Sequence, residues 1–443
     1  MGEYDSVMGK EVVVGLHYYQ PPRFAAHPLI EGISTDPEGK DWTRIITKEC
    51  YRPLAEVGVM EKASFDVFQS LLLQLEKIDP PLAALFYKAA KENGIGEPFI
   101  HPILPDLSNP DKDIVIRAGV NRFQEITGTH PRFFWPPETA IDTPTLVRLA
   151  EAGYEGFICA PQQVYQADGS PSDSTPTIID LPGGRNIIAL PFDQAISSRL
   201  AFDPKINADH FANDIFFPRN RGLKENQILL AWTDAETFGH HWKHADKFLD
   251  YLLDTSLPHV GLYPIPINQL KLDKRRLPHG KIIERTAWSC PHGDLVRWHG
   301  SCSCHREDTS WKKPFYHALG SLNNSVSEIL KDSYGENYSD IVSQFFYIAN
   351  AHPELMDTPE LALVAAKVSS LTARTSCATF FSSPEVSGKI SLLYAYQTLL
   401  YLKQSGLEAA SAKISTQLYK DLDQVHYPHS KGTALATLQH MVG

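Results

Sequence analysis

The sequence predicts an α/β protein with a helical C-terminal part, and two patterns along the chain predict it. Over roughly the first 270 residues, short apolar runs alternate with segments of helical spacing. This alternation is typical of a parallel sheet, either open or closed into a barrel. After residue 312 only helical periodicity remains. We therefore expect an α/β region over residues 1–270, a linking segment over residues 271–312 and an α-helical region over residues 313–443.

The expected strands are short, apolar and rich in β-branched or aromatic residues. They cover Glu11–Tyr19, Ala63–Phe68, Pro98–Leu104, Arg132–Trp135, Gly156–Ala160, Thr177–Leu181, Asn186–Pro191, Gln227–Trp232 and Gly261–Pro264. Gly183 and Gly184 predict a hairpin turn between two of these strands. The helices expected in this region cover Ser70–Ile78, Pro81–Asn93, Asp111–Ile126 (with Gly128 as its C-cap), Thr143–Ala152 and His244–Leu257.

The two later segments differ in composition. The linking segment is basic and contains prolines over Lys271–Lys281, and it is dense in Cys, His and Trp over Arg285–Asp308. The helices expected after it cover Pro314–Lys331, Asp340–Asn350, Pro359–Thr375 and Glu385–Lys403, followed by a less regular tail.

The overall composition excludes several classes of protein. Lys and Arg total 41 against 52 Asp and Glu, so the net charge of −11 argues against binding to nucleic acid. No run of about 18 apolar residues is present, so we expect no membrane-spanning helix. Residues 1–10 lack the basic start and apolar middle of a signal peptide, which predicts a cytoplasmic protein. The 18 His, 18 Tyr and 7 Trp residues are typical of sugar and metal sites, although such residues also fill cores.

The segment Ala231–Trp242 (AWTDAETFGHHW) carries the strongest functional signal. A hydrophobic strand ends at Trp232 and is followed by two carboxylates, Asp234 and Glu236. The aromatic residues around them can stack on sugar faces and exclude water, which raises a carboxyl pKa toward that of a general acid. Histidines such as His240 can donate hydrogen bonds to hydroxyl groups. The alternative is an acidic helix N-cap beside buried aromatic residues.

Two further segments present polar residues where predicted strands end. In Arg132–Asp142 (RFFWPPETAID), two prolines hold Glu138 in a rigid loop, which suits a nucleophile. The alternative for Glu138 is an ordinary acid in the first turn of the helix that follows. Gly15–Arg23 (GLHYYQPPR) places His17 and Gln20 at a strand end, and an ordinary loop is the alternative there. The other polar residues after predicted strands, which can equally be caps or loop residues, are Asp66, His101 and Asp193.

Because active sites of barrels assemble at the carboxyl ends of strands, these residues are candidates for one common site. Neither a G-x-G-x-x-G nor a G-x-x-x-x-G-K-[ST] motif follows a predicted strand, so nucleotide binding has no support from its usual motifs.

The six cysteines include a cluster with metal-ligand spacing. Cys290-x-His292 is followed after nine residues by Cys302-x-Cys304, and three thiols with one imidazole match a tetrahedral zinc site. His299 and His305 are spare candidates. An iron–sulfur centre and reduced thiols without a metal are the alternatives. Of the remaining cysteines, Cys50 and Cys159 are expected in the core, and Cys377 is expected to be a buried residue or, alternatively, a catalytic thiol.

Taken together, these motifs resemble those of glycoside hydrolase family 57. Its first motif is a His-Gln-Pro, matched by His17, Gln20 and Pro21 with Tyr19 where a second His is usual. The run His101–Pro105 (HPILP) matches a stretch often found in its second region. The third motif, W-L-P-E, is matched by Trp135–Glu138 with Pro in place of Leu, and the fourth, D-x-E-x-F-G-H-x-W, is matched at every defined position by Asp234–Trp242. A less characterised subgroup is further marked by the runs His17–Arg23, Trp288–Gly293 and Thr375–Phe381.

The resemblance implies a seven-stranded (β/α) barrel and a retaining enzyme that acts on α-glucans as an amylase, a branching enzyme or a 4-α-glucanotransferase. It implies Glu138 as the nucleophile and Asp234 as the acid/base. The further residues expected to bind substrate are His17, Gln20, His101, Trp135, Glu236, His240 and Trp242. Known catalysis in the family requires no metal, so zinc on Cys290, His292, Cys302 and Cys304 would be structural.

Other functions stay open. A metal-dependent polysaccharide deacetylase uses a related barrel, but Asp234 with His240 and His241 does not neatly give its ligand spacing. A further possibility is a hydrolase of another α-glycoside, such as an α-galactoside. A non-catalytic glucan-binding protein is disfavoured because both carboxylates are present. In each case the expected partner is an oligo- or polysaccharide, and the sequence does not predict the oligomeric state.

Overall fold

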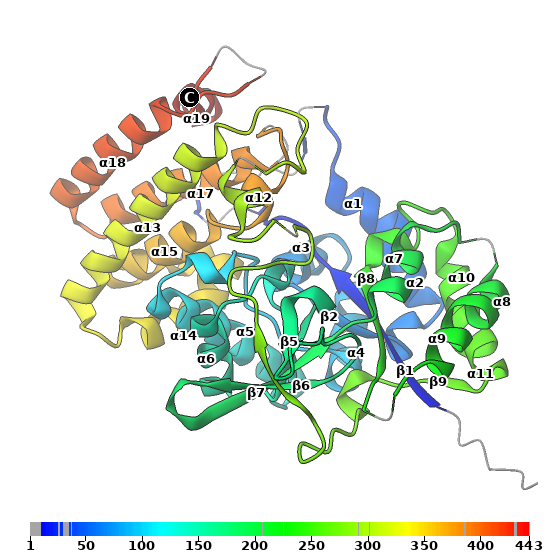
Figure 1. Ribbon diagram of the computed structural model, residues 1–443. Helices are drawn as coiled ribbons and strands as arrows, with labels where there is room; N and C mark the ends of the chain where they lie inside the picture. Colours follow the sequence, from blue (N-terminus) through cyan, green and yellow to red (C-terminus); the bar gives the residue numbers. More distant parts are fainter. Residues whose placement is uncertain are drawn as a thin grey trace, which may run out of the picture.

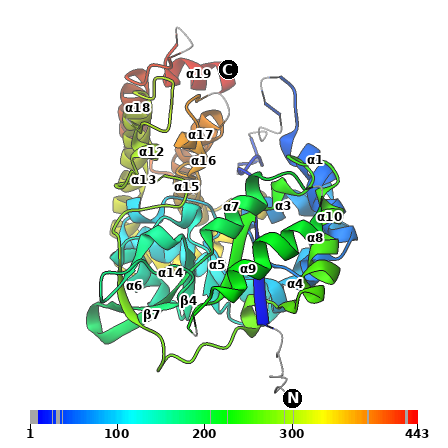
Figure 2. The ribbon, with the colours of Figure 1, turned by 45° about the vertical axis from the view of Figure 1, so that its right-hand side comes forward.

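The computed structural model describes residues 10–24, 27–29, 35–36, 38–205, 207–224, 226–290, 292–300, 302–384, 387–428 and 432–442. The predicted lack of a signal peptide concerns residues 1–9, which lie outside the described residues. A mixed α/β region is followed by a helical region, as predicted, and the C-terminal helices gather on one side of the strands (Figures 1 and 2).

The first sheet is parallel and centres on the first strand of the chain. β1 (Lys10–Tyr18) pairs with β2 (Ser64–Val67) on one side and with β8 (Leu229–Asp234) on the other. β9 (Leu262–Pro264) pairs with the start of β1. From Val12 to Tyr18, β1 is buried on both faces, which is typical of a central parallel strand.

The register of this sheet brings polar residues into one row. His17 lies opposite Asp66 on β2 and opposite Asp234 on β8. Two residues earlier, a Cβ on Gly15 would lie 2.0 Å from the Trp232 ring, so only glycine lets this ring pack across β1. Three predicted polar residues therefore meet at the carboxyl ends of three adjacent strands.

The second sheet has six strands. In spatial order they are β3 (Phe133–Phe134), β4 (Gly156–Cys159), β7 (Arg185–Pro191), β6 (Thr177–Leu181), β10 (His279–Ile282) and β5 (Val164–Gln166). The predicted hairpin is confirmed: β6 and β7 are antiparallel, and Gly183 and Gly184 turn between them with φ values of 76° and 73°. β10 lies in the segment that we expected to be only a linker.

The strand predicted at Pro98–Leu104 is wrong. The chain forms single bridges earlier, at Gly94 with Phe65 and at Gly96 with Phe134, and then runs irregularly into a 3₁₀ turn at Leu104–Asp106. Proline has no N–H to donate to a ladder, and Pro98, Pro102 and Pro105 punctuate this stretch. Backbone pairing in the described residues gives two sheets and no closed barrel, so the seven-stranded barrel stays a prediction.

The helices of the α/β region follow the predicted pattern closely. Asp79 caps α4, Ser108 caps α5, Asp142 caps α6, and Gly128 ends α5 with φ 72°. The predicted helix at His244–Leu257 is α10, which continues through a π-helical turn into α11. The helices are α1 (Trp42–Ile46), α2 (Arg52–Glu56), α3 (Gln69–Ile78), α4 (Pro80–Asn93), α5 (Asn109–Thr127), α6 (Thr143–Glu151), α7 (Gln194–Phe202), α8 (Ala208–His210), α9 (Phe217–Arg221), α10 (Ala245–Tyr251) and α11 (Leu257–His259).

From the end of the linking segment onward, the described residues form the four predicted helices and four more. The predicted ones are α13 (Lys312–Tyr334), α14 (Tyr338–Ala351), α15 (Pro359–Thr372) and α17 (Gly388–Gln404). The others are α12 (Val296–His299), α16 (Cys377–Phe380), α18 (Glu408–Asp423) and α19 (Ala434–Val442). No helix in the described part of the chain is long and apolar enough to cross a membrane.

The two regions share one hydrophobic core. Phe99 and Ile114 of the α/β region belong to the same buried cluster as Phe346 and Leu371 of the helical region. A buried ion pair also crosses between them, because Lys367 Nζ on α15 lies 2.6 Å from Asp111 Oδ1 on α5. The helical region is therefore packed into the α/β region rather than attached to it by a linker alone.

Candidate active site

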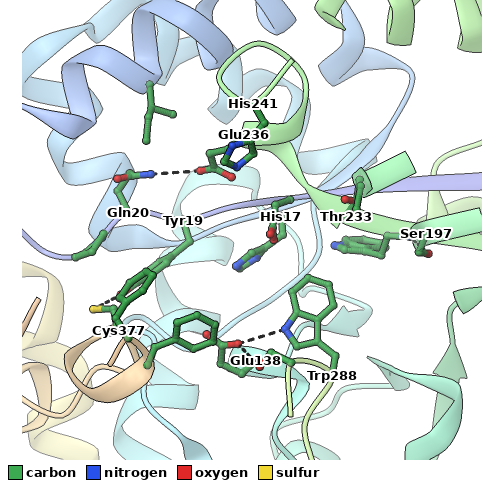
Figure 3. Close-up of a pocket in the computed structure, with 18 of the residues that line it drawn as sticks. His17, Tyr19, Gln20, Glu138, Ser197, Thr233, Glu236, His241, Trp288 and Cys377 are labelled. Atoms are coloured by element: carbon green, nitrogen blue, oxygen red, sulfur yellow. Dashed lines mark hydrogen bonds between the residues drawn. The ribbon is translucent and has the colours of Figure 1, made fainter. Parts of the chain in front are cut away.

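A cavity of about 540 Å³ lies at the carboxyl ends of β1 and β8. Its walls come from both regions, since α7 and the end of β8 face the segment around Trp288 and the end of α16. Figure 3 shows Glu138 and Glu236 directed toward this space from opposite sides. The polar and aromatic residues that line the cavity include His17, Tyr19, Gln20, Glu138, Asp234, Glu236, His241, Trp288, Ser289 and Cys377.

Glu138 is held by three donors from two separate segments. Its Oε2 accepts hydrogen bonds from Ser289 Oγ at 2.9 Å and from Trp288 Nε1 at 3.3 Å, and its Oε1 accepts one from Ser376 Oγ at 3.4 Å. Burial raises the pKa of Glu138, whereas the Ser289 hydrogen bond and the charge of His17 act in the opposite direction. The carboxylate is thus fixed in orientation while it stays beside the cavity.

The backbone at Glu138 is in an unusual conformation. Glu138 and Thr139 have φ values of 57° and 48°, in the left-handed region that β-branched residues rarely adopt. Trp288 N–H donates to Glu138 O at 3.2 Å and to Thr139 Oγ1 at 2.9 Å, and Gln163 Nε2 donates to Thr139 O at 2.8 Å. Such conformations persist only where the surroundings hold them, and they cluster at functional sites.

Asp234 and Glu236 occupy the opposite wall. Asp234 ends β8 and is exposed to the cavity, and Glu236 follows in a 3₁₀ turn over Ala235–Thr237. Burial raises the pKa of Asp234, against the opposing charges of His17 and His241. Burial and the charge of Asp234 raise the pKa of Glu236 to about 7. Glu236 Oε1 also accepts hydrogen bonds from Gln20 Nε2, at 3.3 Å, and from the Tyr51 hydroxyl.

His17 is the cation of the site that acts on the carboxylates. Its Nδ1 lies 2.5 Å from Asp66 Oδ2, and Asp66 Oδ1 accepts a hydrogen bond from Trp232 Nε1 at 3.1 Å. Burial alone would lower the pKa of His17, but the Asp66 charge and hydrogen bond outweigh it and raise this pKa to about 9. The imidazolium is therefore charged at neutral pH and lies close enough to affect both Glu138 and Asp234. Asp66 is fully buried as the partner of His17, not a helix cap.

Four residues predicted to bind substrate do not line the cavity. His101 is 1% exposed and stacks behind Tyr19 with ring centroids 4.2 Å apart. Trp135 is fully buried between His17 and Trp232. His240 Nδ1 is bonded to Glu49 Oε2 at 2.8 Å. Trp242 packs beside Lys205, whose Nζ lies 5.5 Å from the ring centroid. The predicted residues that the cavity does bring together are Glu138, Asp234, Glu236, His17 and Gln20.

The two remaining candidates are structural in character. Asp193 is the N-cap of α7, where its side chain accepts from Ile196 N–H, and it is paired with Arg219. Cys377 Sγ accepts a hydrogen bond from the Tyr19 hydroxyl at 3.2 Å at the cavity wall. Burial raises the pKa of Cys377, so its thiol stays protonated and is a poor nucleophile.

Four contacts of the site were not predicted. The carboxylates of Glu138 and Glu236 are bound from distant parts of the chain by Trp288, Ser289, Ser376 and Tyr51. The runs that contain Ser289 and Ser376 are visible as motifs in the sequence, but a serine within a motif carries no signal of what it binds.

The predicted cysteine cluster is brought together. One ligand atom from each of Cys290, His292, Cys302 and Cys304 lies within 4.8 Å of all the others. His292 Nδ1 is 3.7, 3.6 and 3.4 Å from the sulfurs of Cys290, Cys302 and Cys304, and the first two sulfurs are 3.4 Å apart. The spare candidates point elsewhere: His299 Nε2 pairs with Asp106 Oδ2, and His305 Nε2 with Lys312 Nζ. These four residues can therefore hold a metal ion.

Solved structures of similar fold come from carbohydrate enzymes. An exo-type maltose-forming amylase from Pyrococcus sp. ST04 is 18% identical, with 93% of this chain and 83% of that chain covered and a TM-score of 0.72. A branching enzyme from Pyrococcus horikoshii is 14% identical, with 98% and 94% covered and a TM-score of 0.63. An α-amylase from Thermotoga maritima is 14% identical, with 97% and 99% covered and a TM-score of 0.59.

Comparison with curated proteins gives no match. A sequence model described as glycosyl hydrolase family 57 matches residues 27–262, which is more than half of the chain. This range contains Glu138, Asp234 and Glu236, the three carboxylates of the cavity. The chain therefore belongs to glycosyl hydrolase family 57.

Proposed function

We propose that this protein is a retaining glycoside hydrolase or transglycosylase that acts on α-glucans, with Glu138 as nucleophile and Asp234 as acid/base. One observation carries the proposal: both carboxylates line one cavity, each with a pKa raised by burial, and they come from separate parts of the chain. The α-glucan substrate is supported by the names of the similar structures, which include amylases and a branching enzyme.

In this proposal Glu138 attacks the anomeric carbon and forms a glycosyl-enzyme, while Asp234 gives its proton to the departing oxygen. Asp234 then takes a proton from water or from an acceptor hydroxyl. The oxygen of that group attacks the anomeric carbon and displaces Glu138, which breaks the glycosyl-enzyme bond. The three donors on Glu138 fix its line of attack. The charged His17 stabilises the carboxylate forms of both residues.

Replacement of each carboxylate tests the assignment. We expect Glu138→Ala and Asp234→Ala to lose nearly all turnover of an α-glucan while keeping the circular dichroism of the wild type. With an activated α-glycosyl fluoride, whose departure needs no general acid, added azide should restore turnover to each variant and yield glycosyl azides of opposite anomeric configuration, because azide replaces the nucleophile in one and the base-activated water in the other. Wild-type activity in either variant would overturn the assignment. Asp193→Ala is a matched control, since Asp193 is a buried cap outside the cavity.

Substrate class and reaction type need a separate experiment. Wild-type protein is incubated with a panel of α-glucans and α-galactosides, and the products are separated by size. Redistribution of chain length without new reducing ends identifies a transferase, whereas new reducing ends identify a hydrolase. Turnover of α-galactosides alone would reject the α-glucan proposal and support the other α-glycoside.

A metal-dependent deacetylase would need Asp234 and two histidines as metal ligands, and the described residues do not bring such a set together. His240 Nδ1 is turned to Glu49 and does not line the cavity, and no group of three metal-ligating side chains includes Asp234. Release of acetate from an acetylated glucan, rather than of sugar, would nevertheless reverse this choice.

For the fold, we propose that seven strands of the two sheets together form the barrel of the catalytic region over residues 1–270, with β10 outside it. Single bridges from Gly94 to Phe65 and from Gly96 to Phe134 support a link between β2 and β3. On the other side, Asp193 N–H donates to Leu230 O at 2.6 Å, which supports a link between β7 and β8. Residues 313–443 would then form the helical region against it.

We also propose that Cys290, His292, Cys302 and Cys304 hold a structural zinc ion. Zinc with bonds of about 2.3 Å to sulfur and about 2.0–2.1 Å to nitrogen separates tetrahedral ligands by roughly 3.5–3.8 Å. Two of the observed separations, 3.6 and 3.7 Å, fall within that range, and the other two, at 3.4 Å, lie just below it. Free thiols persist in a reducing compartment, which supports the predicted cytoplasmic location. Metal analysis of protein purified without chelator decides the matter: about one zinc per chain is expected, and less than about 0.2 would reject the site.

A further inference from the structure

The proposed metal site adjoins, in sequence, two residues that bind the candidate nucleophile Glu138. Trp288 and Ser289, which we call the Trp288–Ser289 pair, immediately precede the ligand Cys290. The pair supplies two of the three side-chain hydrogen bonds to Glu138, and Trp288 N–H also binds the backbone of Glu138. Figure 3 shows Trp288 beside Glu138 at the cavity. Any force that positions Cys290 therefore also positions the donors of Glu138.

The segment that carries the cluster has little regular structure of its own. Within Arg285–Ser310 the described residues form only one helix, the four-residue α12, and two isolated bridges, one between Ala287 and Cys290 and one between Thr286 and Ile141. Three of its residues, Arg285, Asp294 and Leu295, have φ values of 55°, 45° and 53°, which are unfavourable for any residue but glycine. Such a segment needs a strong local restraint, which a tetrahedral metal site provides.

The small core around the cluster also connects it to Glu138. Cys290 and Cys302 are buried together with Ala287 and with Ala140, which lies two residues after Glu138. The other two ligands face solvent, since His292 and Cys304 are exposed. A metal at this site is thus accessible to chelators on one side and packed against the Glu138 loop on the other.

We propose that the metal ion on Cys290, His292, Cys302 and Cys304 positions the Trp288–Ser289 pair against Glu138, so that metal occupancy controls turnover. This inference rests on the proposed function of Glu138 and on the proposed metal site. In the metal-free protein the segment loosens, the two hydrogen bonds to Glu138 Oε2 are lost, and the nucleophile is free to turn away from its line of attack. The metal takes no part in the chemistry itself and acts only through the pair.

The first test is a double-mutant cycle between a ligand and the pair. Cys304→Ser removes an exposed ligand, and Ser289→Ala removes one donor to Glu138. We expect zinc content below about 0.2 per chain in Cys304→Ser and kcat lower by roughly 10- to 100-fold, the range seen when outer partners of a functional group are lost. Ser289→Ala should lower kcat by about ten-fold with zinc retained.

The double-mutant cycle separates coupled effects from independent ones, because both changes act on the contact between the Trp288–Ser289 pair and Glu138. The double variant should be no more than a few-fold worse than Cys304→Ser alone, whereas independent effects multiply. Multiplied losses would overturn the proposal, and so would full turnover of the zinc-free variant. Cys159→Ala is the matched control: Cys159 is a fully buried thiol of β4 outside the cluster, and its variant should keep both zinc and turnover.

The second test does not depend on activity and serves if Cys304→Ser does not fold. Tryptophan emission of the wild type is recorded before and after chelation and again after zinc is restored, and the same is done with Trp288→Phe. We expect a reversible red shift in the wild type that is absent in Trp288→Phe. An identical response in both proteins would overturn the proposal. If the wild type acts on no glycoside but shows this shift, the proposed function fails while the metal-dependent position of Trp288 stands.

Discussion

Replacing Asp66 by Asn should abolish the charge of His17. His17 Nδ1 and Asp66 Oδ2 are 2.5 Å apart, and both side chains are buried. Burial opposes the charged imidazole, yet the carboxylate raises the pKa of His17 from 6.5 to about 9. At about 1.4 kcal/mol for each tenfold change, this rise corresponds to roughly 3 kcal/mol of preference for the imidazolium in the folded state.

The sign of the pH dependence follows from the direction of this shift. Because the pKa of His17 is higher in the folded state, the stabilisation is fully present below pH 6.5 and is lost as the pH rises through about 9. In Asp66→Asn the burial of His17 is opposed only by the smaller effects of the Asp234 and Glu236 charges, so we expect the ring to be neutral at pH 7. We expect the free energy of unfolding at pH 7 to fall by about 3 kcal/mol and its decline between pH 7 and 9 to disappear.

Urea unfolding, followed by circular dichroism over this pH range, measures both quantities. His17→Gln should remove the same pH dependence, because it removes the titrating group itself. Asp193→Asn is the control, since it changes a buried carboxylate that faces Arg219 rather than a histidine and should leave the decline intact. An equal decline in the wild type and in Asp66→Asn would refute the reasoning.

Three further predictions concern other parts of the structure. Glu236→Gln should remove an ionisation near pH 7 from the pH profile of kcat/KM, and an unchanged profile would show that Glu236 does not titrate there. Lys367→Ala leaves the buried Asp111 without its cation and should lower the free energy of unfolding in urea by about 3–5 kcal/mol; a loss below about 1 kcal/mol would contradict this. Phe381, 46% exposed at the cavity, should stack on sugar rings, so Phe381→Ala should raise KM for long α-glucans by about ten-fold, or roughly 1.4 kcal/mol. Equal KM values in the variant and the wild type would exclude that contact.

The convergence of the carboxylates could be predicted because it depends on strand ends. Asp234 ends a strand that is clearly apolar in the sequence, and Glu138 follows a short aromatic strand stopped by two prolines. Parallel strands present their carboxyl ends at one edge, so local pattern and topology agree. The cysteine cluster was predictable for a similar reason, since its four ligands lie within one short segment.

Side-chain direction was less predictable than position. Trp135 and Trp242 stand in sugar-binding motifs, yet Trp135 is fully buried beneath His17 and Trp242 lies outside the cavity. The sequence of a loop that follows a strand does not state which face each side chain takes. His241, not His240, therefore lines the cavity, and this choice depends on the 3₁₀ turn at Ala235–Thr237.

Contacts between distant segments could not be predicted from local sequence patterns. Ser376 reaches Glu138 over 238 residues of sequence, and Tyr51 reaches Glu236 over 185. The first contact exists because the helical region packs on the α/β region, and the second because distant segments of the α/β region fold together. Periodicity alone specifies neither. The same limit explains β10, whose four residues form a strand only because β6 and β5 lie on either side of it.

The shared core also governs how the chain folds while it is being synthesised. Phe99 packs on Phe346 with ring centroids 5.0 Å apart, although roughly 250 residues separate them in the order of translation. At about 5–20 residues per second, the apolar surface around Phe99 then waits roughly 10–50 s for its partners. During that interval it is open to aggregation or to chaperones. Slower translation before residue 312 should therefore lower the soluble yield, and a chain ended there should aggregate rather than fold into an independent catalytic unit.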